Sequence, residues 1–250
     1  MIEDGKILFA GHAERYSREK NDPYINKQLM KEACLYGLPD VIVLHESSRL
    51  KNIRRFKQFT WSSIKAAFTE PTMEDWIKKF YPQFKGIPIT NCLHHQSHAA
   101  AGMLTVPHDW RDAVIVTIDA IGEKQTATIS SWEKNQRIML RHEVNFPNSL
   151  GLFYSAVTKA VGLKPMEDEY ILMGMAAYGK PVYKTKMETH LFDAPADDLH
   201  NCLKTINMSK GLPKSFMSQE ALQDEQVQFD LAASAQAVVE ERIFNYCKLA

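Results

Sequence analysis

Three histidines lie close together in the segment His94–His98. If this segment is helical, His94 and His98 lie on the same face, because an α-helix turns once every ~3.6 residues. Two imidazoles one turn apart can bind a single metal ion. His95, on another face, could donate a hydrogen bond or carry a proton. A solvated helix start with chance histidines is the other interpretation, and the position directly after an apolar strand favours the metal site.

An aspartate ends the strongest strand pattern of the chain, at 113–119. Asp119 is followed by a turn that contains Gly122 and Glu123. Ligands gather at the carboxyl ends of strands in α/β folds, and a glycine lets the backbone approach an anion closely. This pattern predicts a metal–phosphate or phosphate site at these three residues, with free backbone N–H groups at Gly122. An aspartate that caps an ordinary β-turn is the alternative, and this pattern taken alone favours it.

A third pattern joins three carboxylates, at 167–169, to the small residues Gly174 and Gly179. Carboxylates at the start of a helix interact favourably with the helix dipole, which explains them without a ligand. The functional interpretation is a helix of small residues that lets a nucleotide approach, with Glu169 and Gly174 as nucleotide-binding residues.

Three cations, Arg15, Arg18 and Lys20, follow the first apolar run within six residues. Guanidinium and ammonium groups bind phosphates and carboxylates through charge-assisted hydrogen bonds. The cluster is therefore a candidate phosphate-binding segment. A solvated charged turn is the alternative, and composition alone favours it.

These residues need an α/β framework to position them. Alternation and β-branched runs predict strands at 6–12, 40–45, 87–93 and 113–119, which we expect to share one sheet flanked by helices. Two more strands, at 126–132 and 137–144, extend the last one as a meander. Periodicity and capping residues predict helices at 26–36, 62–68, 73–80, 97–104, 149–161 and 167–176, and along an apolar stripe from Phe229 to Tyr246.

Composition limits the classes of function. Thirty Lys and Arg balance thirty Asp and Glu, and a net charge of zero excludes a general electrostatic nucleic-acid binder. Neither a run of about 18 apolar residues nor a secretory signal is visible in the sequence. The four cysteines form no C-x-x-C pair, which indicates reduced thiols and a cytoplasmic protein.

Taken together, the motifs resemble the N-terminal part of carbamoyltransferases of the nodulation and antibiotic-tailoring type. The match rests on ERYSREK from Glu14, HHQSHAAAG from His94, TIDAIGE from Thr117, and SLGLFYSAVTKAVGLKP leading into EDEYILMGMAAYG. This resemblance implies the two-lobed α/β fold of actin, Hsp70 and sugar kinases, which the tRNA threonylcarbamoyl transferases share. We expect residues 1–112 to form the first lobe and 113–250 to begin the second, with the fold incomplete at both ends and the C-terminal adenylate-forming domain absent.

The resemblance also implies a reaction. Carbamoyl-adenylate is made from carbamoyl phosphate and ATP, and its carbamoyl group passes to a hydroxyl or amine of a small-molecule acceptor. His94, His98 and Asp119 would bind iron(II) or another divalent metal, and His95 and Asp119 would be catalytic. The resemblance implies neither a nucleic-acid nor a membrane partner. An unfinished lobe would expose the apolar stripe of the last helix, which favours a homodimer.

Two alternatives stay open at this point. A tRNA threonylcarbamoyl-transferase-like enzyme would be expected to carry an acidic residue where Gln96 and Ser97 stand. A relative that binds nucleotide without turnover is the second alternative. The sequence departs from the family pattern at Ala120, Ile171 and Ala177, where glycine, a basic residue and proline are usual. Because phosphate contacts from both lobes are needed and the fold is expected to be incomplete, we expect the chain alone to bind adenine nucleotide weakly or not at all and to show no turnover.

Overall fold

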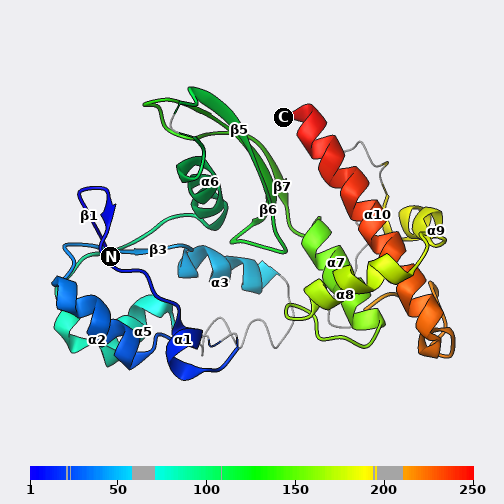
Figure 1. Ribbon diagram of the computed structural model, residues 1–250, viewed down its shortest axis with the longest axis horizontal. Helices are drawn as coiled ribbons and strands as arrows, with labels where there is room; N and C mark the ends of the chain where they lie inside the picture. The colour runs from blue at the N-terminus through cyan, green and yellow to red at the C-terminus, as the bar shows by residue number, and fades with distance from the viewer. Residues whose placement is uncertain (21, 23, 58–70, 108, 194, 196–210) are drawn as a thin grey trace. The chain divides into compact units, whose positions relative to one another are not determined.

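The protein is a mixed α/β molecule with small sheets, shown as a computed structural model in Figure 1. The structure describes residues 1–20, 22, 24–57, 71–107, 109–193, 195 and 211–250. Two compact units divide the chain: the first comprises 1–44 and 68–91, and the second comprises 45–67 and 92–250. The lobes expected at 1–112 and 113–250 stay a prediction. The helix predicted at 62–68 lies outside the described residues.

The first unit combines short helices with two-stranded sheets. Its described helices are α1 (Ala13–Ser17), α2 (Lys27–Ala33) and α5 (Met73–Phe80), with the 3-10 segments Cys34–Tyr36 and Pro82–Phe84. Antiparallel pairing joins β1 (Ile2–Glu3) to β2 (Lys6–Ile7), and parallel pairing joins β3 (Ile42–Leu44) to β4 (Ile89–Asn91).

Local capping explains where two of these helices begin. The side chain of Asn26 accepts hydrogen bonds from the backbone N–H groups at the start of α2. Thr72 and Asp75 form a reciprocal capping box at the start of α5. Such caps satisfy N–H groups that have no partner within the helix. The core that the two helices share contains Ile77, Tyr81 and Phe84.

The second unit is built on a three-stranded antiparallel sheet of β5 (Asp112–Ile118), β6 (Gln125–Glu133) and β7 (Met139–Asn145). This confirms the predicted meander. Because side chains alternate along a strand, β5 presents different residues to its two faces. Thr117 contacts α6 (His94–Leu104), whereas Val116 and Ile118 pack against the main core.

Helices cover both faces of this sheet. α6 packs on β5 and β6, and the long helix α10 (Glu225–Leu249) lies along the other helices of the core, as Figure 1 shows. The remaining described elements are α3 (Ser48–Lys57), α7 (Leu150–Ala160), α8 (Glu169–Met175), α9 (Lys184–Leu191) and the 3-10 segments Ala176–Tyr178 and Ala221–Gln223. In the described part of the chain, every helix is too short or too polar to cross a membrane.

The prediction of one shared sheet is wrong. Among the described residues, the predicted strands belong to three separate sheets. A tight hairpin with positive φ at Asp4 and Gly5 pairs β2 with β1 over two residues. β3 pairs with β4 over three residues. β5 pairs with β6 and not with β3 or β4. Strand patterns identify extended segments, but the pairing depends on where the chain turns.

The stripe predicted on the last helix is largely buried, which corrects the expectation of exposure. Ala232, Ala235 and Tyr246 are in the core, while Ile243 is exposed. Arg242 is also buried, with its guanidinium 3.8 Å from the centre of the Phe192 ring. Fully buried apolar side chains contribute roughly 1.5–3 kcal/mol each, so the contacts of α10 with α7, α8 and α9 stabilise the unit.

Candidate metal centre

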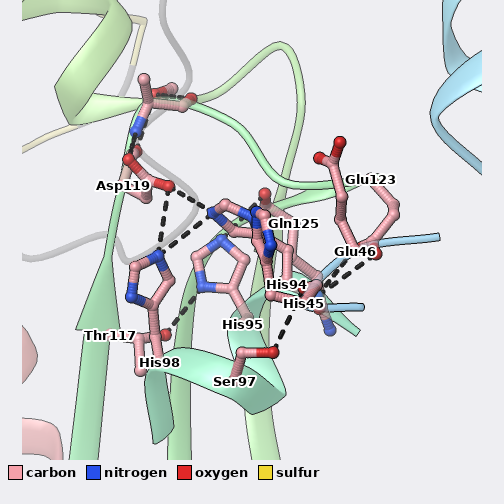
Figure 2. A network of polar contacts seen from close by, with 12 residues as sticks. His45, Glu46, His94, His95, Ser97, His98, Thr117, Asp119, Glu123 and Gln125 are labelled. Atoms are coloured by element: carbon pink, nitrogen blue, oxygen red, sulfur yellow. Dashed lines mark hydrogen bonds and ion pairs between the residues drawn. The ribbon is translucent and has the colours of Figure 1, made fainter. Parts of the chain in front are cut away.

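Two histidines and one aspartate converge where α6 begins and β5 ends (Figure 2). Asp119 directly follows β5 and lies two residues after Thr117, so both side chains point to the α6 face of the sheet. His94 is the first residue of α6, and His98 lies one turn later on the same side. The structure therefore brings His94, His98 and Asp119 together. The spacing of the two histidines predicts their shared face, and the family resemblance implies the addition of Asp119.

The three side chains offer atoms that face a common point. Nε2 of His94 lies 2.6 Å from Oδ2 of Asp119, and Nε2 of His98 lies 3.1 Å from Nε2 of His94. Nε2 of His98 is 3.5 Å from the same oxygen of Asp119. The side chain of His98 is 52% exposed and that of His94 is 17% exposed, so the centre opens to solvent on the His98 side.

This donor set fits a divalent metal. The three atoms lie 2.6, 3.1 and 3.5 Å from one another, and two bonds of about 2.0–2.2 Å to one ion can reach across each of these distances. Two Nε2 atoms only 3.1 Å apart need a proton or a cation between their lone pairs. Imidazole and carboxylate together suit zinc, iron and related ions.

His94 and Asp119 are joined by a hydrogen bond that favours the charged form of both side chains. The hydrogen bond with His94 holds the pKa of Asp119 well below its usual range, although burial opposes this effect. The same bond raises the pKa of His94. The backbone N–H of Ala120 donates to Oδ1 of Asp119 over 2.6 Å, which stabilises the carboxylate further. A metal ion here would be held by His94 and Asp119 in place of the hydrogen bond between them, and its binding would compete with a proton on His94.

His95 lies on another face of α6 than His94 and His98, as expected, and its ring points into the protein. It is only 1% exposed. Its Nδ1 lies 2.7 Å from the hydroxyl of Thr117, and its Nε2 lies 3.0 Å from the carbonyl oxygen of Gln125. Burial lowers the pKa of His95 and so favours the neutral ring. Both ring nitrogens make contacts inside the protein, so His95 holds α6 on the sheet. Its role as a proton carrier stays a prediction.

Glu123 and Gly122 are also engaged within the protein. The carboxylate of Glu123, 5% exposed, accepts hydrogen bonds from the backbone N–H groups of Ser47 and His94. Gly122 lies where a side chain would meet His94, and its N–H donates to the carbonyl of Gln125 over 2.8 Å. The expectation of a free N–H at Gly122 is therefore wrong.

A cavity of about 570 Å³ lies beside the centre, with Asp119 in its wall. Glu169 also lines it and accepts hydrogen bonds from the Ser155 hydroxyl and the Met166 N–H. The other lining residues come from the end of β5, from α7, α8 and α10 and from the segment between α7 and α8: Ile118, Ala120, Leu150, Gly151, Tyr154, Ser155, Met166, Tyr170, Met173, Gln236 and Val239. A cavity of this size suits a small ligand.

The remaining sequence candidates lie elsewhere. Gly174 is exposed on α8 and does not line the cavity. Arg15, Arg18 and Lys20 are exposed residues of the first unit, on or just after α1. Their phosphate-binding role stays a prediction.

Sequence reasoning missed the polar wall of the cavity. The hydroxyl of Tyr154 donates to the side-chain oxygen of Gln236 over 2.8 Å. Burial, with the charges of Glu240 and Glu169, raises the pKa of Tyr154 to about 12. One signal was available, because Gln236 is a polar residue in the Ala-rich part of α10.

Fold and site together define an α/β protein with a two-histidine, one-carboxylate donor set beside a ligand-sized cavity. The chain belongs to the carbamoyltransferase N-terminal family, because the family model described as "Carbamoyltransferase N-terminus" matches residues 1–250. This confirms the resemblance seen in the sequence.

Two relatives are similar to the chain over much of its length. The "Uncharacterized protein sll1178" of Synechocystis sp. is 30% identical, with 98% of this chain and 45% of that protein aligned. The "Uncharacterized protein MJ1051" of Methanocaldococcus jannaschii is 25% identical, with 71% of this chain and 30% of that protein aligned. The chain thus spans less than half the length of these relatives.

Proposed function

We propose that this chain is the metal- and nucleotide-binding part of a carbamoyltransferase. The enzyme transfers the carbamoyl group of carbamoyl-adenylate, made from carbamoyl phosphate and ATP, to a hydroxyl or amine of a small molecule. The bond between the carbonyl carbon and the adenylate phosphate oxygen breaks. A bond to the acceptor oxygen or nitrogen forms, AMP leaves, and the acceptor releases its proton.

One observation carries this proposal: Asp119 belongs both to the metal donor set and to the wall of the cavity. A ligand in the cavity therefore has one end next to the candidate ion. Carbamoyl-adenylate fits this arrangement. Its anionic phosphate and reacting carbonyl would lie next to the ion, and its nucleoside would lie in the cavity. Membership of the carbamoyltransferase family supports the same assignment.

The residues of the chain hold and orient the reactants. His94, His98 and Asp119 would hold iron(II) or another divalent metal. When bound, the ion supplies positive charge that neutralises the adenylate phosphate and polarises the carbamoyl carbonyl. Asp119 stays ionised at neutral pH, because its carboxylate accepts hydrogen bonds from His94 and Ala120.

The cavity provides the nucleoside end of the site. Its wall combines apolar surface from α7 and α8 with the carboxylate of Glu169 and the side chain of Gln236. These polar groups are suited to ribose hydroxyls, and the apolar surface is suited to a base. In the proposed fold, that of actin, Hsp70 and sugar kinases, a nucleotide lies between two lobes.

Cobalt(II) binding tests the proposal, because its visible absorption reports the ligands of the ion. We expect the protein to bind Co²⁺ with an absorption band that His98→Ala abolishes. Millimolar ATP or AMP should change that band. Glu169→Gln should reduce the nucleotide effect and leave Co²⁺ affinity unchanged.

His12→Ala is the matched control, because His12 is an exposed histidine of the first unit. Failure to bind Co²⁺, or equal binding by the His98→Ala variant, would refute the metal centre. A Co²⁺ band that nucleotides leave unchanged would refute the nucleotide site. Transfer itself is measured as radioactive carbamoylated acceptor formed from labelled carbamoyl phosphate, ATP and candidate acceptors.

A further inference from the structure

A second group of potential ligands adjoins the metal centre on the side of α3. His45, Glu46 and His94 each offer one ligand atom, and these three atoms lie within 4.8 Å of one another. The ring centres of His45 and His94 are 6.0 Å apart. This group repeats the two-histidine, one-carboxylate composition of the first set, with His94 common to both.

Only one of the two ring nitrogens of His94 faces the other ligands of the first set. Its Nε2 faces Asp119 and His98. Its Nδ1 is buried and has no hydrogen-bond partner among the described residues. A buried polar atom without a partner destabilises the folded protein. A histidine that binds a metal through one ring nitrogen nearly always makes a polar contact through the other.

Hydrogen bonds fix the backbone on both sides of this group. The single carboxylate of Glu123 binds the N–H of Ser47, which follows Glu46, and the N–H of His94. The hydroxyl of Ser97 donates to the carbonyl oxygen of His45 over 3.2 Å. The segments that carry the three side chains are therefore tied together without any ion.

Access from solvent and a remaining carboxylate oxygen also suit a cation. His45 is exposed, and the side chain of Glu46 is 28% exposed, so an ion can enter from solvent. Nζ of Lys51 lies 2.7 Å from Oε1 of Glu46, which leaves Oε2 as a ligand. Imidazole and carboxylate donors favour the same class of ion as in the first set.

We propose that His45, Glu46 and His94 form a second divalent-cation site, which adjoins the His94–His98–Asp119 centre. The two sites share the ring of His94, with Nε2 toward the first ion and Nδ1 toward the second. A neutral imidazole carries one N–H, so binding through both nitrogens releases that proton to solvent. The second ion therefore binds more weakly than the first.

The test is a Co²⁺ titration of the metal-free protein, followed by calorimetry and visible absorption. We expect two equivalents to bind. His45→Ala and Glu46→Gln should each remove the weaker equivalent and keep the tighter one. His98→Ala should remove the tighter equivalent, and His94→Ala should remove both. His12→Ala should retain both, and circular dichroism checks that each variant is folded.

The outcomes separate this inference from the proposed function. One equivalent that His98→Ala removes, and that His45→Ala and Glu46→Gln leave unchanged, would overturn the second site and keep the first. One equivalent that His45→Ala removes and His98→Ala retains would support the second site and refute the first. Two equivalents that both survive in the His45→Ala and Glu46→Gln variants would also overturn the second site.

Discussion

The carboxylate of Glu123 caps the helix that begins with His94, accepting its backbone N–H over 3.1 and 3.2 Å. The residue before the helix, Leu93, provides no side-chain cap. A carboxylate at a helix N-terminus satisfies an unpaired N–H and interacts favourably with the helix dipole. Glu123 therefore fixes the position of a candidate metal ligand without touching its ring.

Replacing Glu123 by glutamine should destabilise the metal-free protein by about 1.5–3 kcal/mol, the usual contribution of a hydrogen bond to a charged group. The amide keeps one acceptor oxygen and presents an NH₂ group to the backbone N–H groups of Ser47 and His94. Urea unfolding measures the loss. Glu19→Gln, at an exposed position of the first unit, is the control. Equal stability of the two variants would contradict the capping role.

Ser149→Ala should also destabilise the protein, by about 1–3 kcal/mol. The buried hydroxyl of Ser149 accepts the N–H of Leu152 at the start of α7 and donates to the carbonyl of Ala120 over 2.6 Å. The variant leaves both partners without their bond. Ser218→Ala removes a cap from an exposed site, and thermal unfolding should show a clearly smaller change for it.

Two glycines should respond in opposite directions to alanine. A Cβ at Gly151 would lie 2.6 Å from the backbone of Ala120, so Gly151→Ala should cost about 1–3 kcal/mol and weaken Co²⁺ binding by moving Asp119. A Cβ at Gly174 meets no atom within 4 Å. Gly174→Ala should stabilise α8 by about 0.5–1 kcal/mol. Urea midpoints and Co²⁺ titrations of both variants check these signs.

Stability at acid pH should depend on Glu143. The hydrogen bond from Lys124, with help from Asn145 and Gln125, lowers the pKa of Glu143 from 4.5 to about 2. Because its pKa is lower in the folded than in the unfolded state, Glu143 stabilises the protein fully at pH values above 4.5, its pKa when unfolded. This stabilisation is lost as the pH falls from 4.5 toward 2. Glu143→Gln should therefore lose less stability over this range than the wild type does. Urea midpoints at several pH values give the comparison, and parallel curves would contradict it.

Local patterns explain what could be predicted from the sequence. The strand before Asp119 is a run of β-branched residues, and the spacing of His94 and His98 needs only helical geometry. Periodicity predicts that the helix that carries them begins at Ser97. The helix begins at His94 instead, because its cap comes from Glu123, 29 residues away. A distant cap leaves no signal next to the helix.

Non-local contacts explain the rest. The sequence does not say which of two adjacent histidines faces the sheet, and His95 is buried because Thr117 and Gln125 supply partners for its ring. The pairing of β3 with β4 and of β5 with β6 also depends on turns between them. Tyr154 and Gln236 meet across 82 residues of sequence, and only the packing of α7 on α10 brings them together.

The buried ring of His95 determines the rotation of α6 about its own axis. It contacts Thr117 of β5 and Gln125 of β6 at once, so the helix cannot turn by one residue, about 100°, without breaking both bonds. The rings of His94 and His98 keep their direction toward Asp119 when no ion is bound. Metal binding would then leave the rotation of α6 unchanged. It would still require Nε2 of His94 and Oδ2 of Asp119, now 2.6 Å apart, to separate, because two ligands of one ion with bonds of about 2.0–2.2 Å lie roughly 3 Å apart or more.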